Sequence, residues 1–92
     1  MNKKHLKTWD KLWHDPVLSG IVWSDIESML TSIGAEISEG NGSRVRIKLN
    51  YVRAVFQRPH PENTTDKGAV KSMRRFLQSA GVTKEALKNA EI

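Results

Sequence analysis

The fold is decided by residues 40–60, GNGSRVRIKLNYVRAVFQRPH, in which two alternating runs follow a glycine-containing turn. In the first run three basic residues alternate with three aliphatic ones: Arg44, Val45, Arg46, Ile47, Lys48 and Leu49. Successive side chains of a β-strand point to opposite faces of the sheet. The pattern therefore predicts a strand with an aliphatic face toward the core and a cationic face toward solvent.

Turn signals on both sides of this strand predict an antiparallel three-stranded sheet. Gly40-Asn41-Gly42 supplies residues that tolerate the positive φ of hairpin turns. Asn50-Tyr51 predicts a second tight turn, because asparagine adopts the left-handed region readily, although tyrosine does so less well. We expect strands over residues 35–39, 43–49 and 52–57. In the last strand the core side is formed by Val52, Ala54 and Phe56, and the solvent side by Arg53, Val55 and Gln57.

Helices are predicted before these strands. Apolar residues recur at helical spacing between residues 3 and 14, and Asp15-Pro16 ends this helix because a residue before proline avoids the helical region. Ser24-Asp-Ile-Glu27 matches a capping box, in which the serine and glutamate side chains accept backbone N–H groups at a helix start. Gly34 is suited to end that second helix. The tryptophans of this part, Trp9, Trp13 and Trp23, are interpreted as packing residues.

Further helices are predicted after the sheet. Residues 67–80 form an amphipathic helix that Thr65 or Asp66 caps and Gly81 ends, and Thr83 caps a short last turn that reaches Ala90. Two helices packed on one face of the sheet give a two-layer α+β domain. The basic side chains lie on surfaces that this packing leaves open.

Composition limits the class of protein. The chain has 92 residues, which is one domain, and it has no cysteine, which excludes disulfides and thiolate zinc sites. No apolar run is long enough for a membrane span or a signal-peptide core, so we expect a soluble cytoplasmic protein. Of the 15 Lys and Arg residues, nine lie in residues 44–75, against Glu62 and Asp66. This asymmetry favours a polyanionic partner, and the alternative is a solvated basic surface.

A set of basic residues is predicted to bind nucleic acid, with Ser43 beside it. The set consists of Arg44, Arg46, Lys48, Arg53, Arg58, Lys71, Arg74 and Arg75. Arginine and lysine spaced along an open surface can pair with successive phosphates. Apart from Tyr51 no aromatic residue interleaves with them, so contact with an RNA or DNA backbone is favoured over stacking of bases.

His60 is the candidate catalytic group. It lies in the basic segment, within Arg58-Pro59-His60-Pro61, and the flanking prolines restrict its backbone. Histidine can take a proton from a ribose 2′-hydroxyl near neutral pH, while cations stabilise the transition state. The alternative is a loop histidine without chemistry. Glu62 and Asp66 lie nearby, but no carboxylate pair or multi-histidine set is evident, so no metal site and no cofactor are predicted.

Several of these elements, taken in order, resemble the HicA toxins of bacterial type II toxin–antitoxin systems. The stretches SDIESMLTSIGAEISEGNGSRVRIKL and VRAVFQRPHP carry the resemblance, which covers about residues 23–82. It implies a fold similar to a double-stranded-RNA-binding domain, α-β-β-β-α. In a single domain of residues 1–92, residues 1–22 are then an N-terminal helical extension and residues 83–92 a C-terminal tail. It also implies an mRNA interferase, an RNA-binding endoribonuclease that a HicB antitoxin neutralises by covering the active surface.

One position departs from the family pattern. Typical members carry their catalytic histidine directly after the Gly-Ser of the hairpin, and here Arg44 follows Gly42-Ser43. Either His60 supplies the base, or activity is weak or absent, or Arg44 only binds phosphate. We favour a metal-independent ribonuclease that acts on mRNA, with His60 as base or acid and Arg44 and Arg46 stabilising phosphate charge. The alternatives are a non-catalytic RNA-binding module and a protein-interaction domain that meets an acidic partner.

Overall fold

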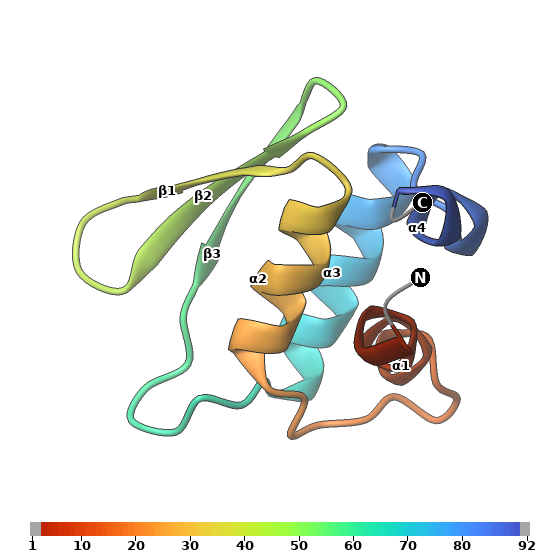
Figure 1. The fold of residues 1–92 in the computed structure, drawn as a ribbon. Helices are drawn as coiled ribbons and strands as arrows, with labels where there is room; N and C mark the ends of the chain where they lie inside the picture. The colour runs from red at the N-terminus through yellow and green to blue at the C-terminus, as the bar shows by residue number, and fades with distance from the viewer. Residues whose placement is uncertain (1–2, 91–92) are drawn as a thin grey trace.

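The computed structural model describes residues 3–90, in which four helices accompany a three-stranded antiparallel sheet (Figure 1). The elements are α1 (Lys3–Leu12), α2 (Trp23–Ser32), β1 (Glu36–Glu39), β2 (Arg44–Leu49), β3 (Val52–Gln57), α3 (Lys67–Ser79) and α4 (Lys84–Asn89). The predicted α+β class is confirmed. So is the order α-β-β-β-α after an additional N-terminal helix.

The sheet has the order β1-β2-β3, and its register follows from the alternation in the sequence. Ile47 of β2 pairs with Ile37 of β1 and Ala54 of β3, and Val45 pairs with Phe56. These residues face the helices, where Val45 and Ile47 are almost completely buried. The prediction of one aliphatic and one cationic face on β2 is therefore confirmed.

Both predicted hairpins form. Gly42 in the β1–β2 turn has a φ of 63°, which glycine adopts at little cost. Asn50 and Tyr51 form the β2–β3 turn with φ values of 51° and 70°. The amide of Asn50 donates to the backbone oxygen of Ala80 (2.9 Å), which fixes this turn against the end of α3. The sheet is thus anchored to the helices at its β2–β3 turn.

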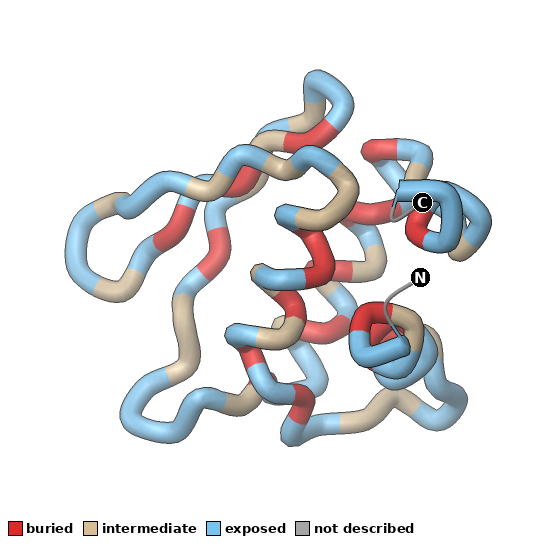
Figure 2. The backbone as a smooth tube through the Cα atoms, viewed as in Figure 1, coloured by how far each residue is buried: buried red, intermediate tan, exposed pale blue. Residues whose placement is uncertain are grey.

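The elements form three layers, where two were expected. α2 and α3 lie side by side against one face of the sheet, and α1 and α4 lie on the side of this helix pair away from the sheet (Figure 1). The inner face of α1 packs against α2 and α3, so that Leu12 is fully buried and Trp9 nearly so, and Leu87 of α4 is also buried (Figure 2). No helix of residues 3–90 lies over the opposite face of the sheet.

Aromatic side chains join the layers. The rings of Trp23 and Phe56 lie 5.9 Å apart, and those of Phe56 and Phe76 5.7 Å apart, so α2, β3 and α3 meet in one cluster. The ring of Trp9 lies 5.6 Å from that of the half-buried Trp13, and the two rings are tilted by 43°. The tryptophans therefore pack as predicted. Among residues 3–90, no helix combines the length and apolar character that crossing a bilayer requires.

The prediction of a capping box at α2 is wrong. The helix begins one residue earlier, after Val22, and no side chain among residues 3–90 caps it. The loop before α3 contacts the helix start instead. The backbone N–H of Trp23 donates to the backbone oxygen of Asn63 (3.0 Å), and the side-chain amide of Asn63 donates to Ser24 Oγ (3.2 Å). The Glu27 side chain is thereby released for other contacts.

The first helix was expected to reach His14, but α1 ends at Leu12, whereas the predicted glycine ends of α2 and α3 and the predicted caps of α3 and α4 are confirmed. Asp66 caps α3 by accepting the Ala69 N–H at 2.7 Å, and Thr83 caps α4 by accepting the Ala86 N–H at 3.2 Å. Gly34 follows α2 with a φ of 95°, and Gly81 follows α3 with a φ of 70°. Left-handed glycines of this kind let a helix end without strain.

Candidate nucleic-acid interface

The uncovered face of the sheet carries a regular array of cations. The register places the outward residues in rows across the strands: Glu36–Lys48–Arg53, Ser38–Arg46–Val55 and Arg44–Gln57. We call Arg44, Arg46, Lys48 and Arg53 the basic sheet face. Arg46, Lys48, Arg53 and the exposed Val55 line a hollow of about 560 Å³ on this face.

The charges of the basic sheet face are largely free of intramolecular partners. Within residues 3–90, Arg44, Lys48 and Arg53 form no ion pair, although Glu36 shares a row with Lys48. Arg46 donates only to the backbone oxygen of Glu39 (3.3 Å). Along β2 the cations recur every two residues, about 7 Å apart. Close cations without counter-charges repel one another, so this face favours an anionic partner.

Arg58 is not part of this face. It lies on the helix side, where its guanidinium bonds both oxygens of Glu27 (2.8 and 3.1 Å) and both oxygens of Glu39 (2.6 and 2.7 Å). Hydrogen bonding to Glu27, and then to Glu39, raises the pKa of Arg58 above its usual range. Glu27 also accepts from the Trp23 indole N–H. The expectation of an open Arg58 is wrong, because its charge is already paired within the fold.

Arg74 also has an intramolecular role. Its guanidinium donates to the backbone oxygens of Leu12 and His14, the latter at 2.7 Å, and lies 5.6 Å from the ring centre of Trp13. These contacts hold the C-terminal end of α1 against α3. The expectation that Arg74 lies on an open surface is therefore wrong.

The two other cations of α3 that were predicted to bind nucleic acid lie apart from the basic sheet face. Lys71 and Arg75 are exposed on α3, and Arg75 donates to Ser72 Oγ at 3.1 Å. Since α3 covers the other face of the sheet, these two side chains do not extend the rows of β2 and β3. Ser43 is half-buried at the start of β2, where its hydroxyl accepts from the Gln57 amide (3.1 Å).

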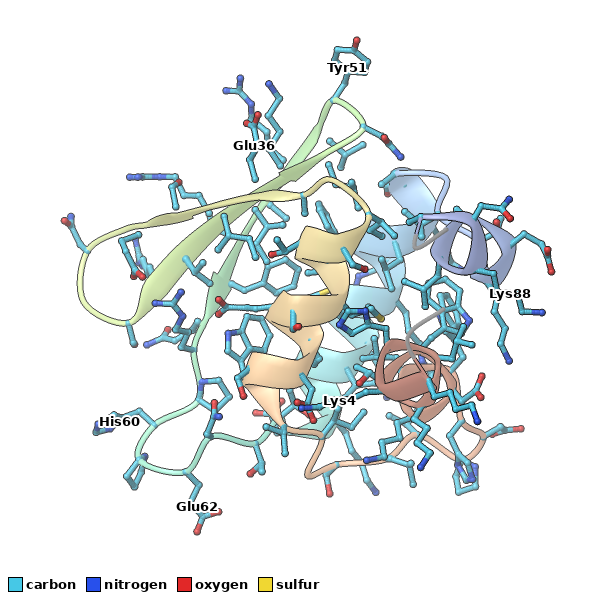
Figure 3. All side chains as sticks on the ribbon, viewed as in Figure 1. Lys4, Glu36, Tyr51, His60, Glu62 and Lys88 are labelled. Atoms are coloured by element: carbon cyan, nitrogen blue, oxygen red, sulfur yellow. The ribbon has the colours of Figure 1, made fainter. Side chains whose placement is uncertain are left out.

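His60 lies in the loop between β3 and α3, and its side chain points away from the body of the protein (Figure 3). It lines a hollow of about 450 Å³ together with Ser43, Gln57, Arg58, Glu62 and Asp66, among others. Arg44 lines a different hollow, with Val55, Phe56 and Gln57. The two candidate catalytic residues therefore line different hollows, and Gln57 lines both of them.

Little in the described chain orients the His60 ring. Among residues 3–90 no hydrogen bond to its nitrogens is found, whereas His14 hydrogen-bonds the Pro16 oxygen (2.9 Å) and His5 hydrogen-bonds Ser28 Oγ (3.1 Å). In the same part of the chain, no group of three or more His, Asp or Glu side chains is arranged to hold a metal ion.

The comparison with known families agrees with this architecture. The family model described as HicA toxin of bacterial toxin-antitoxin matches residues 23–82, from the start of α2 to just beyond α3. The chain belongs to the HicA toxin family. No curated protein and no solved structure matches the chain significantly.

Membership of the HicA family defines the fold and the general role. The α-β-β-β-α core is the double-stranded-RNA-binding-domain-like fold of HicA, and α1 and α4 lie outside the matched residues. The protein is the toxin of a toxin–antitoxin system, which implies an antitoxin partner. Arg44, the first residue of β2, directly follows the Gly42-Ser43 pair of the hairpin.

Sequence reasoning missed two residues of this HicA domain that shape the site. Glu27 and Glu39 remove Arg58 from the basic surface, and the only local signal was the expected capping role of Glu27. The sequence interpretation also gave little weight to Tyr51, because a single aromatic residue at a turn does not form a repeating sequence pattern.

Proposed function

We propose that this HicA-family toxin is an mRNA interferase, which binds RNA on its basic sheet face, cleaves it in the cytoplasm, and is neutralised by a HicB-type antitoxin. The observation that supports the proposal is the array of four cations on the face of the sheet that no helix of the described chain covers. None of the four forms an ion pair within residues 3–90.

Binding by this face is mainly electrostatic. Each phosphate that a guanidinium or ammonium group neutralises releases condensed counterions, so the affinity falls as salt rises. The planar guanidinium groups of Arg44, Arg46 and Arg53 can each hold a phosphate through two hydrogen bonds. Such contacts fix the position of the backbone without selecting a base sequence.

The proposed cleavage uses the 2′-hydroxyl of the RNA as nucleophile. His60 takes its proton, the 2′-oxygen bonds to the adjacent phosphorus, and the bond from phosphorus to the 5′-oxygen breaks. A proton from water or from the imidazolium of His60 reaches the leaving oxygen, and the products carry a 2′,3′-cyclic phosphate and a 5′-hydroxyl. Arg44 and Arg46 stabilise the negative charge on the phosphorane-like transition state. This route requires no metal ion.

A non-catalytic RNA-binding toxin is the second candidate, and a specific observation favours it. Arg44 is permanently protonated and cannot serve as a base. His60 lines a hollow that Arg44 does not reach and that also contains the carboxylates of Glu62 and Asp66. On this hypothesis the basic sheet face binds RNA and blocks its use without cutting it.

One assay distinguishes the two candidates. Purified protein is incubated with single-stranded RNA in EDTA, beside the variants His60→Ala and His14→Ala, and the termini of the products are analysed. We expect the wild type and His14→Ala to cut equally and to leave cyclic phosphates, and His60→Ala to lose at least 100-fold in rate, the scale of general acid–base catalysis. His14 is the matched control because it is also exposed and lies far along the chain from the β3–α3 loop.

Each other outcome has a defined meaning. Equal cleavage by all three proteins rejects the role of His60. Binding without cleavage by the wild type supports the second candidate. Absence of RNA binding by the wild type refutes both. For the antitoxin, expression of the toxin alone should arrest growth, and co-expression of a neighbouring HicB-type reading frame should relieve the arrest.

A further inference from the structure

Tyr51 is a large aromatic residue that contributes almost nothing to the fold. Its relative exposure is 96%, and its ring projects from the tip of the β2–β3 hairpin, away from the body of the protein (Figure 3). It is the most exposed large hydrophobic residue in the described chain. Removal of its ring therefore exposes no core and breaks no packing.

The backbone at Tyr51 is also unfavourable for tyrosine. Its φ of 70° lies in the left-handed region, which residues other than glycine, asparagine and aspartate rarely adopt. In a two-residue turn with positive φ at both positions, the second position usually holds glycine. The neighbouring Asn50 suits its position and secures the turn through Ala80. Backbone strain that the surrounding structure holds in place occurs preferentially at functional positions.

The location of Tyr51 indicates its function. Lys48 and Arg53 form the last row of cations before the turn, and the turn that carries Tyr51 follows one residue pair later. The basic sheet face therefore ends at an exposed aromatic ring. A positively charged surface that follows a backbone, together with an aromatic side chain on which a base stacks, is how proteins bind single-stranded nucleic acid.

We propose that Tyr51 is the stacking platform for one unpaired RNA base, and that Lys48 and Arg53 hold the phosphates beside it. The RNA segment at this turn is accordingly unpaired, even though the fold resembles a double-stranded-RNA-binding domain. In a duplex the bases are stacked internally, and the ring has no free base face to contact. This inference rests on the proposed binding of RNA by the basic sheet face.

The test compares Tyr51→Gly and Tyr51→Phe with the wild type. The probe is a short single-stranded 2′-O-methyl oligonucleotide, which lacks the 2′-hydroxyl and so is not cut, with 2-aminopurine as a fluorescent base. A duplex of the same sequence is the control. We expect Tyr51→Gly to bind the single strand about 5- to 150-fold more weakly, the effect of losing one base–aromatic stack. It should also lose the quenching of 2-aminopurine that stacking produces.

Two further results are expected. Tyr51→Phe retains the affinity and the quenching, because the aromatic face is intact. Tyr51→Gly retains the unfolding midpoint, because the ring is not packed and glycine suits the positive φ. It also retains the salt dependence of binding, since no phosphate contact is removed. Lys48→Ala, in contrast, reduces that salt dependence.

The outcomes separate this inference from the function on which it rests. Unchanged affinity of Tyr51→Gly for the single strand, while Lys48→Ala weakens binding, overturns the stacking role and leaves RNA binding in place. Equal losses in Tyr51→Gly and Tyr51→Phe overturn it as well, because the hydroxyl would then be the contact. A wild type that binds neither strand nor duplex refutes the proposed function itself. If Tyr51 instead contacts a protein partner, Tyr51→Gly should bind the single strand as tightly as the wild type does.

Discussion

Replacement of Arg58 by alanine should destabilise the fold and leave the basic sheet face intact. The guanidinium joins Glu27 of α2 to Glu39 of β1 at the end of β3. Its loss leaves the Glu27 carboxylate with the Trp23 indole as its remaining donor in the described chain. The link between helix and sheet at this point would be lost with it.

The magnitude follows from the exposure of each partner. The Glu39 side chain is 67% exposed, so its pair with Arg58 contributes about 0.5 kcal/mol, as solvated ion pairs do. The side chains of Arg58 and Glu27 are 32% and 20% exposed, so solvent screens their two charged hydrogen bonds, and together these contribute about 1.5 kcal/mol, the lower end for one such bond. The expected loss is therefore about 2 kcal/mol. For a domain of this size it lowers the unfolding midpoint by roughly 8–16 °C.

The assay is urea denaturation followed by tryptophan fluorescence, combined with RNA binding under conditions where every variant is folded. Arg53→Ala is the matched control, because Arg53 is an arginine of the same segment with no ion pair in the described chain. It should change the free energy of unfolding by less than about 0.5 kcal/mol, as surface substitutions do, and should weaken RNA binding. Arg58→Ala should instead lower the free energy of unfolding by about 2 kcal/mol and leave RNA binding unchanged.

Arg58→Lys provides a graded test. Lysine keeps the charge but cannot bond two carboxylates through a planar fork, so an intermediate loss of stability is expected. A free energy of unfolding within about 0.5 kcal/mol of the wild type for Arg58→Ala would refute the structural role. Weaker RNA binding by folded Arg58→Ala, with an unchanged stability, would restore Arg58 to the binding surface.

Three further predictions concern single side chains. Arg74→Ala should lower the free energy of unfolding by about 1–3 kcal/mol and speed amide hydrogen exchange in α1, because the backbone oxygens of Leu12 and His14 lose their donor. Unchanged exchange would contradict the proposed link between α1 and α3. Asp66→Ala should cost about 1 kcal/mol by removing the cap of α3, and Asp66→Asn, which retains an accepting oxygen, should restore most of it. Lys48→Ala should lower the slope of log affinity against log salt by about 0.7, and an unchanged slope would show that Lys48 contacts no phosphate.

The sheet could be predicted because its signals are local. Val45 and Arg46 are neighbours in the sequence, and their side chains point to opposite faces of the sheet because successive strand residues alternate between the faces. This alternation does not depend on the rest of the chain. The β2–β3 turn followed in the same way from Asn50, and β3 has the predicted bounds. The basic sheet face was therefore visible in the sequence before the register of its rows was known.

Helix ends were predicted with mixed success for a physical reason. Asp66 and Thr83 cap α3 and α4 because each needs only the amide three residues later in its own segment. Ser24 matches the same pattern, but Asn63 from a distant loop bonds Trp23 and Ser24 instead. A local motif is reliable only where no other part of the chain competes for the same groups.

By itself the sequence determined the order of the elements, the two faces of the sheet and the family to which the domain belongs. Tertiary structure alone decided which cations remain available to a partner. Arg53 and Arg58 are alike in the sequence, yet one lies on an uncovered face and the other bonds carboxylates 31 and 19 residues away. Charge is a property of a residue, but its availability depends on partners that only the folded chain brings within hydrogen-bonding distance.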